Sequence, residues 1–226
     1  MKFILTCGGT AGHINPALAI AGRLRELMPD CGILFIGAEG KMEMELVPRE
    51  GYKIEALKIT NISRGKSFDA LKHNFETLKN VAVSTHEAKR IIREYKPDAV
   101  IGTGGYVCYP VLKAAHDLGV ATAVHESNAV PGLTTKLLAE HVNKVMVGFE
   151  ESRSAYHHPD KVEVTGTPVR GEFATYSKAQ AKRELGLDPD EPLVVSVWGS
   201  LGAAHMNKVM GELIPMLDET KEFHLI

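Results

Sequence analysis

The sequence predicts an α/β protein with a Rossmann-like parallel sheet and the start of a second Rossmann-like domain. Short apolar runs alternate with longer stretches of helical period, which is typical of βαβ units. The apolar runs are continuous rather than alternating, as expected for strands that helices cover on both faces. Residues 164–170, which contain glycine and proline, interrupt this pattern before a second α/β pattern begins.

Five apolar runs are expected to form strands of the first domain, at residues 2–7, 33–36, 98–101, 121–124 and 145–147. The first run leads through a glycine-rich loop into a helix. Asn15 is expected to cap that helix and Pro16 to occupy its first position.

The break at residues 164–170 places a domain boundary near residue 166, which gives domains at 1–166 and 167–226. The second domain is expected to contain a helix at 177–185, a strand at 193–198 and a helix at 203–217. A further strand begins at 223–226, where the sequence given stops. We therefore expect the second domain to be incomplete, with about a hundred residues missing.

Composition excludes several classes of function. A formal net charge of -2 argues against binding of nucleic acid, which requires a large excess of Lys and Arg. The three cysteines have neither disulfide nor metal spacing, which indicates a reducing, intracellular setting. The start of the chain is strand-like rather than a signal peptide, and no apolar stretch reaches the roughly 18 residues that a membrane span needs. The acidic segment 188–190 is interpreted as a turn, so no metal site is expected.

Three glycine-rich loops follow predicted strands, at residues 8–13, 102–106 and 199–203. Glycine lets backbone N–H groups approach an oxygen-rich ligand, and a following helix start adds partial positive charge. Ligands of open α/β sheets bind at the carboxyl ends of strands, where all three loops are expected. A single loop of this kind is more often a tight turn, but three together favour a binding crevice. The first loop lacks the spacing of the dinucleotide fingerprint, so a dehydrogenase is not expected.

Five motifs together resemble the MurG family of GT-B glycosyltransferases. They lie at residues 8–13, 102–110, 125–133, 166–170 and 199–203, in matching order and spacing. The resemblance implies transfer of N-acetylglucosamine from UDP-N-acetylglucosamine to the muramoyl sugar of undecaprenyl-linked lipid I. The product is lipid II for peptidoglycan synthesis, and no cofactor or metal takes part. It also implies a cytoplasmic enzyme, peripheral on the inner face of the cell membrane.

The sequence departs from the family pattern at Ser127, Thr167 and Trp198, where the family usually has Gln, Asn and Gly. These departures concern donor contacts. The family's second domain carries most of the donor contacts, so the chain by itself is expected to be inactive or nearly so.

The resemblance also implies site residues. The donor-binding positions are expected to be Thr10, Ala11, Gly12, Asn128, Arg170 and Ser200. The loops for acceptor or phosphate are expected to use Gly9, Gly104, Gly105 and Tyr106. Arg170 is equally suited to an interdomain ion pair.

Inverting sugar transfer needs a base that takes a proton from the acceptor hydroxyl. His13 is the first candidate, because a helix start disfavours the imidazolium and leaves a nitrogen able to accept a proton. Glu126 is the second, and its alternative role is to cap the helix that starts near Gly132. Without the resemblance, His13 is as well explained by backbone hydrogen bonds alone.

Residues 61–96 contain eight Lys or Arg against four Asp or Glu, with Phe68, Leu71, Phe75 and Leu78 at helical spacing. Such a helix either lies on an anionic membrane or packs on the sheet as an ordinary amphipathic helix. Two other functions remain open. One is a non-catalytic module that recruits to the membrane or binds the acceptor and needs a separate catalytic partner. The other is a sugar-nucleotide epimerase of the same architecture.

Overall fold

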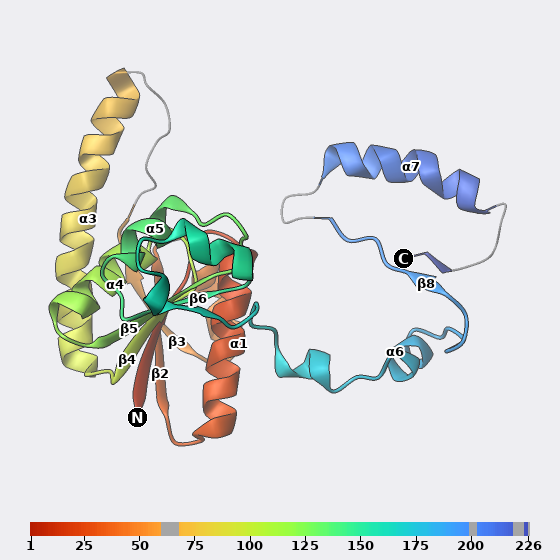
Figure 1. Ribbon diagram of the computed structural model, residues 1–226, viewed down its shortest axis with the longest axis horizontal. Coiled ribbons are helices and arrows are strands. Elements are labelled where there is room, and N and C mark those ends of the chain that lie inside the picture. The colour runs from red at the N-terminus through yellow and green to blue at the C-terminus, as the bar shows by residue number, and fades with distance from the viewer. Residues whose placement is uncertain (60–67, 199–202, 219–223, 226) are drawn as a thin grey trace. The chain divides into compact units, whose positions relative to one another are not determined.

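The computed structural model describes residues 1–59, 68–198, 203–218 and 224–225 (Figure 1). The chain divides into two compact units, Met1–Gly171 (unit 1) and Glu172–Ile226 (unit 2). The predicted α/β class with a parallel sheet is confirmed in unit 1.

Unit 1 contains a seven-stranded sheet in the order β3-β2-β1-β4-β5-β6-β7, in which all neighbouring strands are parallel. The strands are β1 (Lys2–Thr6), β2 (Gly32–Ala38), β3 (Lys53–Leu57), β4 (Ala99–Gly102), β5 (Ala121–Glu126), β6 (Lys144–Val147) and β7 (Val162–Val164). In chain order, strands β1 to β3 are added toward one edge of the sheet, and strands β4 to β7 toward the other. The topological switch point, where ligands of such sheets bind, therefore lies between these two strands.

All five predicted strands of the first domain are present, but the two edge strands were not predicted. β3 reads Lys-Ile-Glu-Ala-Leu, and only Leu57 is buried. β7 has three residues. Edge strands are paired and covered less fully, so they lack the continuous apolar run that identifies the central strands.

Helices cover both faces of the sheet. The helices of unit 1 are α1 (Ala11–Leu27), α2 (Glu43–Arg49), α3 (Phe68–Tyr95), α4 (Cys108–Asp117) and α5 (Leu133–Ala139). Two short 3-10 helices, η1 (Glu150–Ala155) and η2 (Pro159–Lys161), lie between β6 and β7. Figure 1 shows α1 and the pair α3 and α4 on opposite sides of the sheet. In the described part of the chain, no helix combines the length and the hydropathy that crossing a bilayer requires.

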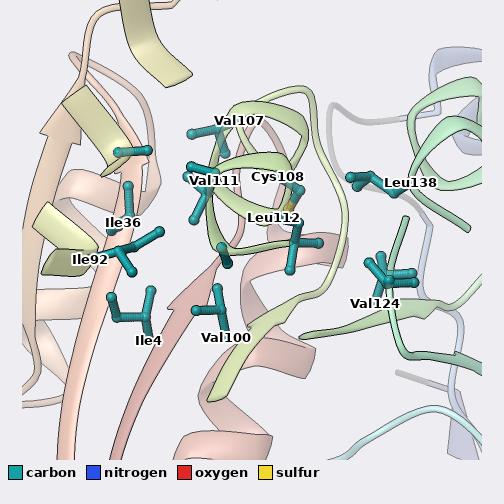
Figure 2. Close-up of a cluster of buried hydrophobic side chains, with 14 of the residues drawn as sticks. Ile4, Ile36, Ile92, Val100, Val107, Cys108, Val111, Leu112, Val124 and Leu138 are labelled. Carbon is teal, nitrogen blue, oxygen red and sulfur yellow. The ribbon is translucent and has the colours of Figure 1, made fainter. Parts of the chain in front are cut away.

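Alternate residues of the central strands enter two separate hydrophobic clusters. Phe3 and Leu5 of β1 pack with α1 and α2, whereas Ile4 enters the cluster beneath α3, α4 and α5. Figure 2 shows the latter cluster, in which Val111 and Leu112 of α4 face residues of β1, β2 and β4. Burial on both faces explains why the central strands are apolar throughout.

The predicted start of the first helix is wrong. α1 begins at Ala11 with Thr10 as its N-cap, so Asn15 is no cap and Pro16 lies inside the helix. Proline at this position cannot make the helical hydrogen bond to the carbonyl of Gly12. Because α1 begins at Ala11, residues 11–13 belong to its first turn.

Unit 2 contains α6 (Lys178–Glu184), β8 (Leu193–Val194), α7 (Ala204–Asp218) and β9 (His224–Leu225). A short 3-10 helix, η3 (Gly171–Ala174), lies at the junction of the two units. The two predicted helices of unit 2 are present, while the strand predicted at 193–198 is limited to β8, which pairs in parallel with β9. The acidic segment 188–190 forms a turn in which the amide of Asp190 donates to the Oδ1 of Asp188 at 2.9 Å.

Candidate active site

The first two glycine loops meet at the switch point of the sheet. β1 and β4 are neighbours, and their pairing continues past the strands, where the amide of Thr103 donates to the carbonyl of Thr6 at 3.0 Å. Beyond it, the amide of Gly8 donates to the carbonyl of Gly104 at 3.2 Å. The prediction that these two loops converge is therefore confirmed. The third loop, with Ser200, lies outside the described residues.

Glycine is required at the contact between the two loops. Gly105 has a φ of +89°, and a Cβ there would lie 2.3 Å from the carbonyl oxygen of Gly8. Gly104 has a φ of +115°, and a Cβ there would lie 2.5 Å from Cδ2 of His13. Both positions need a left-handed backbone and also leave no space for a side chain.

His13 lies half-buried in the first turn of α1, against the second loop. Its Nδ1 is 2.9 Å from the carbonyl oxygen of Gly8, and Thr103 Oγ1 donates to its backbone carbonyl at 2.7 Å. A carbonyl oxygen only accepts, so this contact requires the proton on Nδ1. The Nε2 of the neutral ring is then an acceptor, which is the form a general base needs.

The N-terminus of α1 forms the other half of the site. Thr10 has an extended backbone, and its side chain makes no capping hydrogen bond. Among the described residues, no backbone acceptor pairs with the amides of Ala11 and Gly12, and the first turn has no acidic residue. Unpaired amides at the start of a 17-residue helix form a site for an anion.

Glu43 also contributes to the site, although no motif in the sequence pointed to it. It lies on α2 with its side chain fully buried. Its Oε2 accepts the amide of Gly9 at 3.1 Å, and its Oε1 accepts the amide of Ala38 at 3.0 Å. Gly8 and Gly37 leave room for it, since a Cβ on either would lie within 2.6 Å of this side chain. A short segment with several Glu residues carries no signal that one of them is buried.

Glu126 ends β5, one strand beyond β4, and is buried. Its Oε1 accepts the backbone amide and the side-chain amide of Asn128, at 3.0 and 2.7 Å. Its Oε2 accepts the amide of Gly132 at 3.0 Å and the hydroxyl of Thr135 at 2.8 Å. Burial by itself raises the pKa of this carboxyl, but the donors outweigh burial and the pKa is lowered. These contacts match the capping role that the sequence left open, because they tie the loop 127–132 to the start of α5.

Asn128 and Tyr106 border the site. Asn128 is exposed while its amide group is held by Glu126, so its orientation is fixed. Tyr106 is half-buried beside Gly9, and burial, followed by the nearby Glu43, raises the pKa of its hydroxyl. The site thus combines Gly9, Thr10, Ala11, Gly12, His13, Gly104, Gly105 and Tyr106 at the ends of β1 and β4.

Arg170 pairs with Glu50 at 3.1 Å. This is the ion-pair role that the sequence left open, and both residues belong to unit 1, which ends at Gly171. Gly166, four residues before Arg170, also has a partner in the sheet. The Nε2 of the buried His125 lies 2.9 Å from its carbonyl. Burial lowers the pKa of this imidazole, which favours its neutral form, and Nε2 donates to the carbonyl of Gly166.

Residues 3–147 match the glycosyltransferase family 28 N-terminal domain. The chain belongs to glycosyltransferase family 28.

Curated relatives of the chain are named UDP-N-acetylglucosamine--N-acetylmuramyl-(pentapeptide) pyrophosphoryl-undecaprenol N-acetylglucosamine transferase. That of Acetivibrio thermocellus is 45% identical over 226 residues, which cover 100% of the chain and 60% of the relative. That of Thermoanaerobacter sp. strain X514 is 43% identical, with 100% and 61% covered. The family 28 chain thus spans about 60% of the length of these relatives.

Solved structures agree with this assignment. The crystal structure of MurG from Acinetobacter baumannii matches with a TM-score of 0.68 and 26% identity. The match covers 92% of the present chain and 55% of the MurG chain. The predicted resemblance to MurG and the GT-B fold class are thereby confirmed. The UDP-GlcNAc 2-epimerase of Methanocaldococcus jannaschii matches with a TM-score of 0.59 at 14% identity. The match covers 100% of the present chain and 64% of the epimerase chain. At that identity the likeness concerns the fold alone.

Proposed function

We propose that the chain is part of an enzyme that transfers N-acetylglucosamine from UDP-N-acetylglucosamine to the muramoyl sugar of lipid I, giving lipid II. One observation carries the proposal: an imidazole with an accepting Nε2 lies in the first turn of a helix whose start has unpaired amides, at the switch point of the sheet. The names of relatives that are 41–45% identical support it. So does the presence of the fold in MurG of Acinetobacter baumannii.

The chemistry follows from these groups. The hydroxyl oxygen of the acceptor attacks the anomeric carbon of the donor sugar while His13 Nε2 takes the hydroxyl proton. The bond between the anomeric carbon and the diphosphate oxygen breaks, and UDP leaves with the electron pair. The configuration inverts because attack and departure occur on opposite faces. Amides of Ala11 and Gly12 stabilise negative charge that develops on the diphosphate.

Other residues take supporting roles in this proposal. Glu126 holds the loop that presents Asn128, and His13 is the base. Thr10, Asn128, Arg170 and Ser200 complete the donor contacts, while Gly9, Gly104, Gly105 and Tyr106 form the loops for the acceptor or its phosphate. The predicted domain 1–166 binds the acceptor on the membrane side, and residues 167–226 begin the donor-binding domain.

Because the proposed acceptor is lipid-linked, we infer that the enzyme works at the inner face of the cytoplasmic membrane. The supporting feature is the excess of Lys and Arg in residues 61–96, most of which belong to α3. Sedimentation with vesicles of anionic lipid tests this. Salt-sensitive pelleting is expected, and a chain that stays in the supernatant with both anionic and neutral vesicles contradicts it.

Transfer is tested with a hybrid chain, in which residues 1–171 are joined to the remainder of the Acetivibrio thermocellus relative. Labelled N-acetylglucosamine is expected to move from its UDP carrier to a lipid I analogue. Release of an epimerised sugar nucleotide without acceptor would support the epimerase alternative. Acceptor binding with no turnover by a folded hybrid chain would support the non-catalytic module.

A further inference from the structure

The peptide group between Gly8 and Gly9 is hydrogen-bonded to a side chain at each end. Its N–H, from Gly9, donates to Glu43 Oε2 at 3.1 Å, and its carbonyl, from Gly8, accepts from His13 Nδ1 at 2.9 Å. The described chain has no cis peptide bond. In a trans peptide the N–H and C=O point in opposite directions, so the carboxylate and the imidazole lie on opposite sides of one planar group.

The position of Glu43 suits this arrangement. Its side chain is fully buried, and both carboxylate oxygens accept backbone amides, one from Gly9 and one from Ala38 at the end of β2. The half-buried His13 lies across the peptide from it, in the first turn of α1. A buried carboxylate therefore reaches the candidate base through a single peptide group.

We propose that Glu43 is a positioning residue that acts on His13 through the Gly8–Gly9 peptide, an inference that rests on the proposed role of His13 as base. Hydrogen bonds in a chain polarise one another, particularly away from water. An anionic acceptor at the N–H makes the carbonyl a stronger acceptor for Nδ1–H. The proton is thereby held on Nδ1, and Nε2 stays free to accept one.

The same contact favours the imidazolium that forms when Nε2 takes the proton of the acceptor hydroxyl. The Nδ1–H bond to Gly8 strengthens as positive charge develops on the ring. A buried aspartate does the same for the histidine of a Ser-His-Asp triad, by direct contact. Here one peptide group lies between the carboxylate and the imidazole.

A structural role for Glu43 predicts something different. By joining the amides of Gly9 and Ala38, the carboxylate also ties the first loop to the end of β2. If that is its only effect, Glu43→Gln lowers stability but leaves the tautomer of His13 unchanged. The tautomer therefore separates the two roles.

The first experiment measures this tautomer in the chain itself, by ¹⁵N NMR of the labelled imidazole of His13. The proton is expected on Nδ1 in the unmodified chain. Glu43→Gln is expected to lower the ratio of Nδ1–H to Nε2–H about tenfold, the size of a typical net hydrogen-bond contribution. Glu45→Gln is the matched control, because Glu45 is exposed on the same helix and pairs with Arg49. An unchanged ratio in folded Glu43→Gln overturns the proposal.

A second measurement needs no substitution, in case Glu43→Gln does not fold. In the unmodified chain, the amide ¹⁵N and ¹H shifts of Gly9 are followed while the ring of His13 is titrated. Polarisation through the peptide requires both to change with the same midpoint. A Gly9 amide that does not respond to the charge on the ring overturns the proposal.

Turnover separates this inference from the proposed function. In the hybrid chain, Glu43→Gln is expected to lower kcat about tenfold, the lower end of the loss seen when the outer hydrogen-bond partner of a metal-bound histidine is removed. KM is expected to change less than about twofold. In a His13→Ala background, Glu43→Gln is expected to have no further effect. If His13→Ala retains normal turnover, the base assignment fails. If His13→Ala is inactive but Glu43→Gln turns over normally, the role of Glu43 fails.

Discussion

Gly105 lies against the carbonyl of Gly8, so close that a Cβ at position 105 would stand 2.3 Å from the oxygen. Gly105→Ala is therefore expected to separate the two loops, because the neighbouring atom is backbone and has little freedom to move. A left-handed backbone and overpacking together cost about 3 kcal/mol of unfolding free energy. Urea denaturation of the chain measures this loss.

Gly119→Ala serves as the control for this substitution. Gly119 also has a positive φ, +71°, but a Cβ there would meet nothing within 4 Å. It is expected to cost about 1 kcal/mol, from backbone strain alone. Equal losses at positions 105 and 119 would show that the contact between the loops contributes nothing.

His13→Ala tests the candidate base. It is expected to lower kcat of the hybrid chain about a hundredfold or more, since general bases contribute at least this much. Binding of UDP-N-acetylglucosamine should change little, because the amides of Ala11 and Gly12 are backbone groups and remain. Isothermal calorimetry and initial rates measure the two effects. Near-normal kcat would remove His13 from the mechanism.

Glu126→Gln distinguishes a loop anchor from a base. Both oxygens of Glu126 accept hydrogen bonds. The amide nitrogen of Gln takes the place of one of these oxygens, so it faces either the donors of Asn128 or those of Gly132 and Thr135. An unmet donor in a buried site costs about 2 kcal/mol, which urea denaturation of the chain detects.

The exposed Glu163, paired with Lys144, provides the control, and Glu163→Gln is expected to cost less than about 0.5 kcal/mol. If Glu126→Gln leaves stability intact and abolishes turnover, Glu126 is the better candidate for the base.

The core of the fold was predictable because its signal is repeated along the chain. Each central strand is buried on both faces and therefore reads as an apolar run, as in β1 and β4. Parallel order then places the loops at 8–13 and 102–106 at one edge of the sheet. These two facts predicted that the loops carrying His13 and Gly104 lie at the same edge of the sheet, while the contact between the two residues is a finding of the structure.

What sequence did not predict depends on single contacts. Glu43 differs from Glu45 only in the face of α2 on which it lies, and its partners are amides at distant positions of the chain. The start of α1 was misplaced because Asn15-Pro16 is a strong local signal, which the tertiary contacts of the loop override. Local patterns carry no information about which donor a buried carboxylate meets.

Asp117 is expected to make stability depend on pH. It joins two helices, since its Oδ2 lies 2.7 Å from Lys89 Nζ of α3 and its Oδ1 contacts Lys113 of α4. These bonds to Lys113 and Lys89 lower the pKa of the carboxyl to about 2. A lowered pKa means that the stabilisation is complete above the pKa of the unfolded chain, about 3.9. It is lost as the pH falls from about 4 to about 2.

Comparing Asp117→Asn with the unmodified chain isolates this contribution. At pH 7 the variant is expected to be about 1 kcal/mol less stable, because the partly exposed pair is screened by water. The difference is expected to shrink as the pH falls below about 4, since the carboxyl of the unmodified chain then also becomes neutral. Urea denaturation at pH 7, 4 and 3 measures the difference, with Asp160→Asn on η2 as an exposed control. A difference that stays constant over this range would mean that Asp117 stabilises the helices through its shape and not through its charge.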